Sequence, residues 1–254
     1  MIQDPTKPMI AVFEKYRNRF EPYSLFERFM EFVIAGFDIT FTTLDRPFRK
    51  EEQETCMELL NVWVTTMNEV LKTKEWYDIL GEVYMNYLSG TMKKQWTGQF
   101  FTPIHICDLM AQITDPGEKG GESIMDCCCG SGRMLLAAHI IHPGNYCYAQ
   151  DMDRICCLMT VCNFLIHGVR GEVVCGNSLD PTDYRDGWKV NETLNILGVP
   201  GVRKMDKMEC ATYRSGIDMV KEKLIEDAPV SAEAKVQPKT KIKKQNEPIQ
   251  YTLF

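Results

Sequence analysis

The chain has 254 residues, 44% of them apolar, and a formal net charge of −6 at pH 7. That length accommodates one large domain or two small ones, and the apolar content can supply a core. The acidic balance argues against a protein built mainly to wrap nucleic acid. No run of about 18 apolar residues is present, and the first ten residues lack the apolar centre of a signal peptide, so we expect no membrane span and a cytoplasmic location.

Residues 1–95 are predicted to form an all-helical domain. Apolar residues recur at helical spacing in 21–37 and in 51–73, and a third amphipathic helix is expected over 76–90, ended by Gly90. In the first of these segments the stripe comprises Leu25, Phe26, Phe29, Phe32, Val33 and Phe37. In the second it comprises Met57, Leu60, Val64, Met67 and Leu71, and we expect both stripes to be buried.

Residues 96–227 are predicted to form an α/β domain. Four short apolar strands are expected, at 122–127, 145–150, 171–176 and 193–198. Between the first three strands lie two apolar helices, at 133–141 and 154–168, and one more helix is expected over 204–227. Such alternation predicts a parallel sheet covered on both faces. The segment 228–254 is rich in Lys, Pro, Glu and Gln, which predicts a disordered tail.

Eleven cysteines raise the question of a metal or redox site. Nine of them lie between Cys107 and Cys175, and three are consecutive, Cys127–Cys129. Structural zinc sites use spaced pairs of cysteines, and adjacent residues on a strand point to opposite faces. We therefore interpret the cysteines as reduced thiols that act as small hydrophobic residues, and we predict no metal site.

Polar groups follow the first three predicted strands. Asp126 ends the first, and a Gly-Ser-Gly turn at 130–132 comes directly after it. Asp151 ends the second strand, where a carboxylate can accept bonds from two hydroxyls, and Asp153 can cap the following helix. Asn177 follows the third strand. Because ligands bind at the carboxyl ends of parallel strands, this order of turn, acid and amide predicts a nucleoside site.

Four segments carry a resemblance to a known family. They are GQFFTP at 98–103, IMDCCCGSGRMLLAA at 124–138, YAQDMD at 148–153 and GNSLD at 176–180. Their order and intervals resemble those of the N-6 adenine DNA methylase family, specifically the modification subunit of type I restriction-modification systems. The resemblance covers about residues 75–180 and implies a Rossmann-like methyltransferase sheet. It also implies S-adenosylmethionine as cofactor and methyl transfer to the exocyclic amine of adenine in DNA.

The resemblance implies a role for each matching residue. The methionine end of the cofactor would meet Gln99, Phe100, Phe101, Thr102 and Pro103. The methionine and sugar would be lined by Asp126, Gly130, Ser131, Gly132 and Arg133. Asp151 would hold the ribose hydroxyls and Met152 would lie against the adenine. Asn177 stands where the family commonly has a carboxylate for the adenine amino group, a bond that an amide oxygen can also accept. At the helix start, Thr102 is expected to cap and Pro103 to be the first helical residue.

The catalytic motif of the family is missing. Adenine methylases carry Asn-Pro-Pro-aromatic after the fourth strand, where these groups orient the target amine and stack on the flipped base. Here residues 193–205 read TLNILGVPGVRKM, with one proline and no aromatic residue. DPTDY at 180–184 lacks the second proline and follows the third strand. The catalytic residues therefore stay unassigned, and we predict an incomplete sheet.

Two hypotheses of function follow. The first is an adenine-specific DNA methyltransferase that is catalytically impaired alone and depends on a second chain for base recognition or catalysis. The second is a non-catalytic module that keeps the S-adenosylmethionine fold and is recruited to DNA through partners. Lys93, Lys94 and Arg133 are candidates for DNA phosphate contacts, with an ordinary solvated charged face as the alternative.

The final residues, QYTLF, resemble the short motif by which bacterial proteins dock on the DNA polymerase sliding clamp. The motif positions are Gln250, Leu253 and Phe254, at the end of a polar tether. An apolar Leu-Phe anchor would enter a pocket of the clamp while the Gln amide bonds at its rim. The alternatives are a segment that folds back on the protein's own surface, or a chance match to a short pattern.

Overall fold

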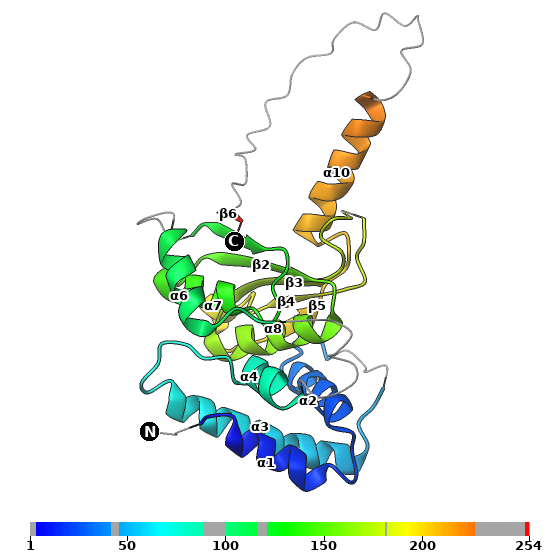
Figure 1. The fold of residues 1–254 in the computed structure, drawn as a ribbon. Coiled ribbons are helices and arrows are strands. Elements are labelled where there is room, and N and C mark those ends of the chain that lie inside the picture. The colour runs from blue at the N-terminus through cyan, green and yellow to red at the C-terminus, as the bar shows by residue number, and fades with distance from the viewer. Residues whose placement is uncertain are drawn as a thin grey trace, which may run out of the picture.

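The computed structural model describes residues 4–41, 46–88, 100–115, 121–180, 182–226 and 252–253. Four helices form a layer beneath the sheet (Figure 1): α1 (Lys7–Tyr16), α2 (Pro22–Gly36), α3 (Lys50–Val70) and α4 (Ile79–Asn86). The α2 start is fixed by the Glu21 side chain, which accepts bonds from the backbone N–H groups of Tyr23 and Ser24. The helical character expected for this region is confirmed over the described residues.

The predicted buried stripe of α3 is wrong by about one residue. Met67 is buried as predicted, but Met57 and Val64 are each 47% exposed, and the other buried apolar positions are Cys56, Leu59, Trp63 and Val70. Apolar residues lie on both sides of this helix, so periodicity alone did not distinguish the two faces. The face that carries Trp63 is the buried one because α1 and α2 pack against it. Phe29 of α2 lies edge-on to the indole, with the ring centroids 6.0 Å apart.

The sheet has six strands in the order β5-β4-β3-β2-β1-β6. They are β1 (Ser123–Asp126), β2 (Tyr146–Asp151), β3 (Arg170–Cys175), β4 (Asp186–Val190), β5 (Val202–Lys204) and β6 (Thr252–Leu253). β1, β2 and β3 are parallel, as predicted, and β6 adds parallel to the outer edge of β1. The α/β fold class and its first three strands are thus confirmed.

The fourth strand lies elsewhere than predicted. Residues 193–198 contain the short helix α9 (Leu194–Leu197), and the next strand in the chain is β4. β4 and β5 run antiparallel to their neighbours, so the sheet is mixed rather than wholly parallel. Asn191, with a φ of 55°, ends β4, and its buried side-chain amide donates to the carbonyls of Phe164 and Val169. That tertiary anchor turns the chain before a strand can form at 193–198.

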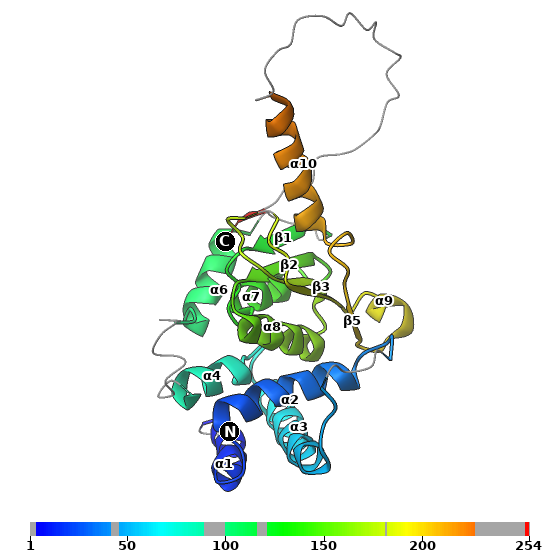
Figure 2. The same ribbon diagram turned by 90° about the vertical axis from the view of Figure 1, so that its right-hand side faces the viewer.

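Helices cover one face of the sheet. α8 (Arg154–His167) packs on β2 and β3, α7 (Arg133–Ile141) on β1, and α6 (Ile104–Ile113) on α7. α8 is apolar nearly all round because α2 packs on its other side (Figure 2). On the opposite face, Met205 and Cys210 pack on Val174, while α10 (Ala211–Glu226) projects away from the body. Two-sided helical cover, as predicted, is therefore wrong for this face.

The helical layer and the sheet share one buried apolar cluster, which runs from Met9 through Trp63 and Leu136 to Val202. The division at residue 95 stays a prediction, as does the tail boundary at 228. Among the described residues, none of the helices has both the length and the apolar character needed to cross a membrane.

Candidate functional site

Two backbone bonds draw the carboxyl ends of β1, β2 and β3 together. The Cys129 N–H, after β1, donates to the carbonyl of Gln150 in β2 at 2.9 Å. The Gly176 N–H, after β3, donates to the carbonyl of Asp151 at 2.9 Å. The polar residues that follow the three strands therefore lie along one edge, as the sequence predicts for a ligand site.

Asp151 is oriented by two backbone donors. Its Oδ2 accepts from Gly130 N–H at 2.9 Å and its Oδ1 from Asp153 N–H at 2.9 Å. Each oxygen keeps a further lone pair, so the carboxylate can accept two more bonds. Burial raises the pKa of this half-buried carboxyl, and the bonds from Asp153 and Gly130 oppose that shift. Asp153 also caps α8 through Ile155 N–H, as predicted.

Asp126 is buried at the end of β1 and accepts a bond from Cys128 N–H at 3.1 Å. Burial raises its pKa to about 6, the Cys128 bond lowers it, and the neighbouring Asp151 charge raises it further. A buried carboxyl that accepts one hydrogen bond within the described part of the chain retains capacity for a cationic or donor group of a ligand.

Glycine is required twice in the turn between β1 and α7. Gly130 has a φ of 55° and Gly132 a φ of 84°, both in the left-handed region. A Cβ on Gly130 would lie 2.9 Å from the Phe101 ring. That ring is stacked on Tyr84 at 5.5 Å, so Phe101 lies over the turn. The Thr160 hydroxyl donates to the Gly130 carbonyl at 3.0 Å and holds the turn from below.

Ser131 and Arg133 do not face an open site. The Ser131 hydroxyl donates to Asp78 Oδ2 at 2.6 Å, and Arg133 Nε donates to the same oxygen at 2.7 Å. Arg133 also pairs with Glu82 at 2.8 Å, and its side chain is only 5% exposed. Its predicted contact with a DNA phosphate is not compatible with this buried pairing. Both side chains hold the turn in position, so they would affect a bound cofactor indirectly and not by contact.

Asp78 is the functional residue that the sequence reasoning missed. It is fully buried at the start of α4 and accepts four bonds, from Gly81 N–H, Ser131, Arg133 and Asn163. Asp78 stands three residues before Gly81, a spacing typical of a helix cap. Its carboxylate does cap α4, because it accepts a bond from Gly81 N–H. The three contacts with residues more than 50 positions away are tertiary and leave no local pattern.

The start of α6 differs by one residue from the prediction. Pro103 is the N-cap, because its carbonyl accepts the first helical bonds, from Ile106 and Cys107. The Thr102 carbonyl instead accepts from Arg133 at 3.2 Å, which keeps Thr102 outside the helix. Phe100 is 85% exposed. Gln99 lies outside the described residues, as do Lys93 and Lys94.

Met152 and Asn177 complete the edge. Met152 follows Asp151 and is 57% exposed, which leaves its side chain free to lie against a planar ligand. The Asn177 side-chain oxygen accepts from Leu179 N–H at 3.1 Å, so one lone pair remains for a ligand donor. A cavity of about 180 Å³ on the uncovered sheet face extends beside this edge and is lined in part by Gln150, Ser178 and Tyr213.

The cysteine triplet places its thiols in three environments. Cys129 is buried, Cys127 is half-buried and Cys128 is exposed. Burial raises the pKa of the Cys129 thiol well above its ordinary value, which favours the neutral form. All eleven cysteines are free thiols, and nine are buried. A buried neutral thiol contacts its neighbours as a small hydrophobic group, so the interpretation fits Cys129 but not the exposed Cys128.

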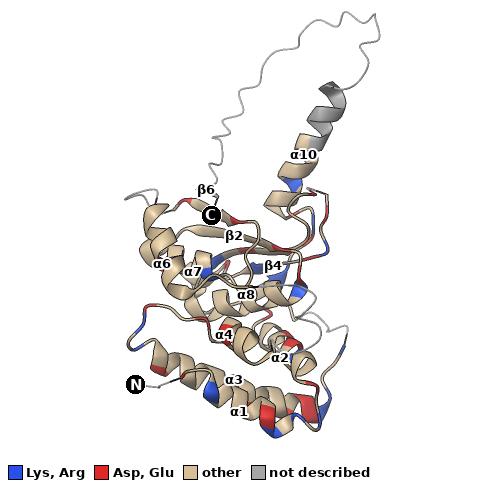
Figure 3. Cartoon of the chain, viewed as in Figure 1, with Lys and Arg blue, Asp and Glu red and all other residues tan. Residues whose placement is uncertain are grey.

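The described polar side chains of DPTDY are engaged in bonds to their own neighbours. Asp180 accepts from the Thr182 backbone and hydroxyl, and Asp183 accepts from Asn177 N–H at 2.8 Å. The Tyr184 hydroxyl donates to the Met205 carbonyl. Basic and acidic residues are interspersed along the chain (Figure 3). A second cavity, of about 370 Å³, lies between α2 and β5 and is lined in part by Arg28, Arg154 and Asp186.

A glycine turn after β1, a held carboxylate after β2 and an amide after β3 lie along one edge of this α/β fold. Residues 75–196, just under half of the chain, match the family model described as N-6 DNA Methylase. This match confirms the resemblance found in the motifs of the sequence.

The relatives agree with this assignment. The type I restriction enzyme MjaVIII methylase subunit of Methanocaldococcus jannaschii is 29% identical over 157 residues, 58% of this chain and 26% of that subunit. The MjaVII methylase subunit of the same organism is 30% identical over 134 residues, 48% of this chain and 22% of that subunit. The chain therefore spans about a quarter of the length of these curated relatives.

A solved structure is also similar. It is the methyltransferase subunit of a type I restriction-modification system from Streptococcus thermophilus, 21% identical, with 68% of this chain and 43% of that chain covered. The TM-score is 0.35, and no part of the assignment rests on it.

The raised pKa of Asp126 predicts how stability depends on pH. The folded protein retains this proton up to about pH 6, whereas the unfolded chain loses it near 3.8. The stability due to this group is thus fully present below pH 3.8 and is lost as pH rises to about 6. Asp126→Asn should raise the free energy of unfolding at pH 7.5 by up to about 3 kcal/mol, with little change at pH 4.

Urea unfolding of both proteins at pH 4, 5.5 and 7.5 measures this effect, and the exposed Glu75→Gln serves as control. Equal stability of Asp126→Asn and wild type at all three pH values would contradict the burial argument.

Proposed function

We propose that this chain binds S-adenosylmethionine along the edge formed by β1, β2 and β3, and that it acts on DNA in the cytoplasm as part of an adenine-N6 methyltransferase. Asp151 carries the proposal. Its carboxylate is held by Gly130 and Asp153 N–H groups and still has two acceptor positions, which suits a pair of ribose hydroxyls.

The neighbouring residues fit the rest of the cofactor. Asp126 provides a buried carboxylate for the cationic methionine end, and the turn at Gly130 allows close approach of the backbone. Met152 is exposed beside Asp151, where it can lie against the adenine, and Asn177 retains one acceptor position. When bound, the cofactor supplies the methyl group that is transferred.

The chemical step needs groups that we do not find among the described residues. Orienting an adenine amine requires an acceptor set and an aromatic ring next to the methyl group. Asp180, Asp183 and Tyr184 are occupied by bonds within their own turn and with Met205. We therefore propose that the isolated chain binds the cofactor but is catalytically impaired.

Cofactor binding can be measured by titration calorimetry with S-adenosylhomocysteine, the demethylated product. Asp151→Ala should lower the affinity by about 5- to 150-fold, equivalent to about 1–3 kcal/mol for lost hydroxyl bonds. Cys128→Ala is the matched control, because this exposed thiol lies in the same turn and is expected to leave binding unchanged. Tight binding of NAD with none of S-adenosylhomocysteine would refute the site.

Catalytic impairment can be tested in cells. Plasmid DNA co-expressed with this chain should stay fully sensitive to restriction enzymes that N6-methyladenine blocks, because base-positioning groups contribute several kcal/mol to such a step. A known adenine methyltransferase serves as positive control. Protection at any site that is lost in Asp151→Ala would show that the chain methylates DNA by itself.

The alternative function is a non-catalytic module recruited to DNA through the sliding clamp, with Gln250, Leu253 and Phe254 as the docking residues. The sequence of the last five residues favours it. The structure adds a condition, because the backbone of Thr252 and Leu253 pairs with β1 and would have to be released first. This pairing agrees with the fold-back alternative.

A pull-down with purified sliding clamp tests the recruitment. The intact chain should be retained, and a variant with Leu253 and Phe254 both replaced by Ala should not. Retention of both proteins, or of neither, would remove this alternative.

A further inference from the structure

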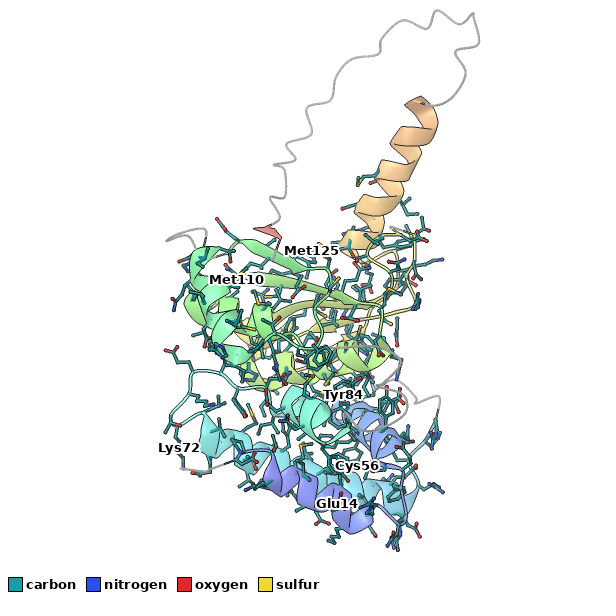
Figure 4. All side chains as sticks on the ribbon, in the orientation of Figure 1. Glu14, Cys56, Lys72, Tyr84, Met110 and Met125 are labelled. Atoms are coloured by element: carbon teal, nitrogen blue, oxygen red, sulfur yellow. The ribbon has the colours of Figure 1, made fainter. Side chains whose placement is uncertain are left out.

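The cavity of about 370 Å³ lies between the helical layer and the sheet, on the side of β4 and β5. Side chains occupy the boundary between these layers, where Tyr84 of α4 lies (Figure 4). In both views α2 lies beneath α8 and the β4–β5 side of the sheet (Figures 1 and 2). Arg28, Glu31 and Ala35 stand at the spacing i, i+3, i+7 and therefore share the face of α2 that lines the cavity. α8, β4 and β5 supply the other walls, so the cavity borders both layers.

The chain that follows α2 ties this helix to β5. Val202 N–H donates to the carbonyl of Phe37 at 2.9 Å, and Ile39 N–H donates to the carbonyl of Val202 at 3.0 Å. The same residues pair as a parallel bridge between Asp38 and Val202. A molecule between α2 and β5 therefore meets walls that backbone bonds hold in place, as is typical of a largely preformed ligand site.

Part of the lining is apolar. Ile34 and Ala35 come from α2, and Leu158 comes from α8. Trp188 of β4 and Val202 of β5 line the cavity from the sheet. Leu158, Trp188 and Val202 are each 1% exposed, so these walls belong to the packed interior. Such a lining suits the apolar or planar body of a small molecule.

The ionic part of the lining holds five cations and three carboxylates. Each carboxylate already has a partner. Glu31 lies 2.9 Å from Arg154 Nη1, and Asp186 accepts a bond from Lys204. Asp38 accepts two bonds within its own turn. A cationic ligand would have to displace one of these partners, whereas the excess of cations favours an anion.

Two of the five cations have donors that the described part of the chain does not use. Arg28 is 6% exposed, and its Nε is buried with no hydrogen-bond partner among the described residues. Arg154 pairs with Glu31 through Nη1, while its Nε lies 3.9 Å from Asp186, beyond hydrogen-bond distance. Arg203, by contrast, is engaged by carboxylates through all three guanidinium nitrogens. A buried donor without an acceptor costs free energy, and an acceptor in the cavity removes that cost.

We propose that this cavity binds a small organic oxyanion, a phosphate or carboxylate that carries an apolar or planar body. The oxyanion accepts bonds from Arg154 and Arg28, and the body lies against Leu158 and Val202. The bound molecule contacts α2, α8 and β5 at once and so links the helical layer to the sheet. The lining shares no residue with the cofactor edge described above, so this inference goes beyond the proposed function and does not rest on it.

The probe is phenyl phosphate, titrated calorimetrically into the full chain. One molecule should bind per chain, at least about tenfold more tightly than inorganic phosphate or phenol, because each of these carries only half of the recognised chemistry. Benzoate is titrated in parallel, and the tighter of the two aromatic anions identifies the preferred oxyanion. Arg154→Gln should weaken binding at least about tenfold through the lost charge-assisted bond. Arg17→Gln, which removes an exposed cation paired with Glu14 on α1, is the control and should change nothing.

A second variant tests the location without changing any charge. Ala35→Leu adds volume inside the cavity and keeps a good helix former in α2, so it should abolish binding while thermal unfolding stays cooperative. Saturation with S-adenosylhomocysteine should leave the affinity for phenyl phosphate unchanged, because the two sites share no residue.

Three results would overturn the proposal: no binding of either aromatic anion, equal affinity of Ala35→Leu and wild type, or competition with S-adenosylhomocysteine. Phenyl phosphate bound no more tightly than inorganic phosphate would indicate an adventitious ion only and would also overturn it. Binding that responds to Arg154→Gln and Ala35→Leu in a chain that binds no S-adenosylhomocysteine would support the cavity site and refute the proposed function.

Discussion

The position of the glycine turn between β1 and α7 depends on one buried carboxylate. Asp78 belongs to the helical layer, yet it accepts bonds from Ser131 and Arg133 in the turn and from Asn163 in α8. Burying an ion pair costs solvation, and the cost is offset only when the remaining acceptor positions are also filled. Here four donors meet two oxygens, so removing any partner would leave a buried polar group unsatisfied. The glycine turn therefore cannot keep its shape independently of α4.

This dependence explains which parts of the site were predictable. Asp126, Asp151 and Asn177 follow strands whose apolar runs are local, and parallel strands bring their ends together without further information. The cap formed by Asp153 was also predictable, because its bond from Ile155 N–H is local in the chain. Arg133 could not be placed, because its orientation is set by Asp78 and Glu82, more than 50 residues earlier in the chain.

The fold shows the same division between local and tertiary control. The α3 stripe was off by one residue because both of its faces carry apolar side chains, and only the packing of α1 and α2 selects Trp63. The fourth strand was misplaced because β4 has only Trp188 and Val190 as large apolar residues, and because Asn191 is fixed by carbonyls of α8 and the following loop. Neither constraint is visible in a window of ten residues.

The candidate cofactor edge rests on strands that hold one another. Most of the groups proposed to bind the cofactor follow β1, β2 and β3, and these strands are joined through bonds such as that of Gly130 to Asp151. The three inner strands therefore form this edge together, whatever pairs on the outer side of β1.

The energetics of β6 decide how readily that edge changes occupant. Closing a connection of about 25 residues costs about 3 kcal/mol in chain entropy. A two-residue strand gains a few backbone hydrogen bonds, each worth about 1 kcal/mol net, and the two terms nearly cancel. The pairing of Thr252 and Leu253 with β1 is then a marginal equilibrium, which any longer parallel strand would displace. Release of Thr252 and Leu253 is the condition for the proposed clamp docking through Leu253, so that docking would draw on the same equilibrium.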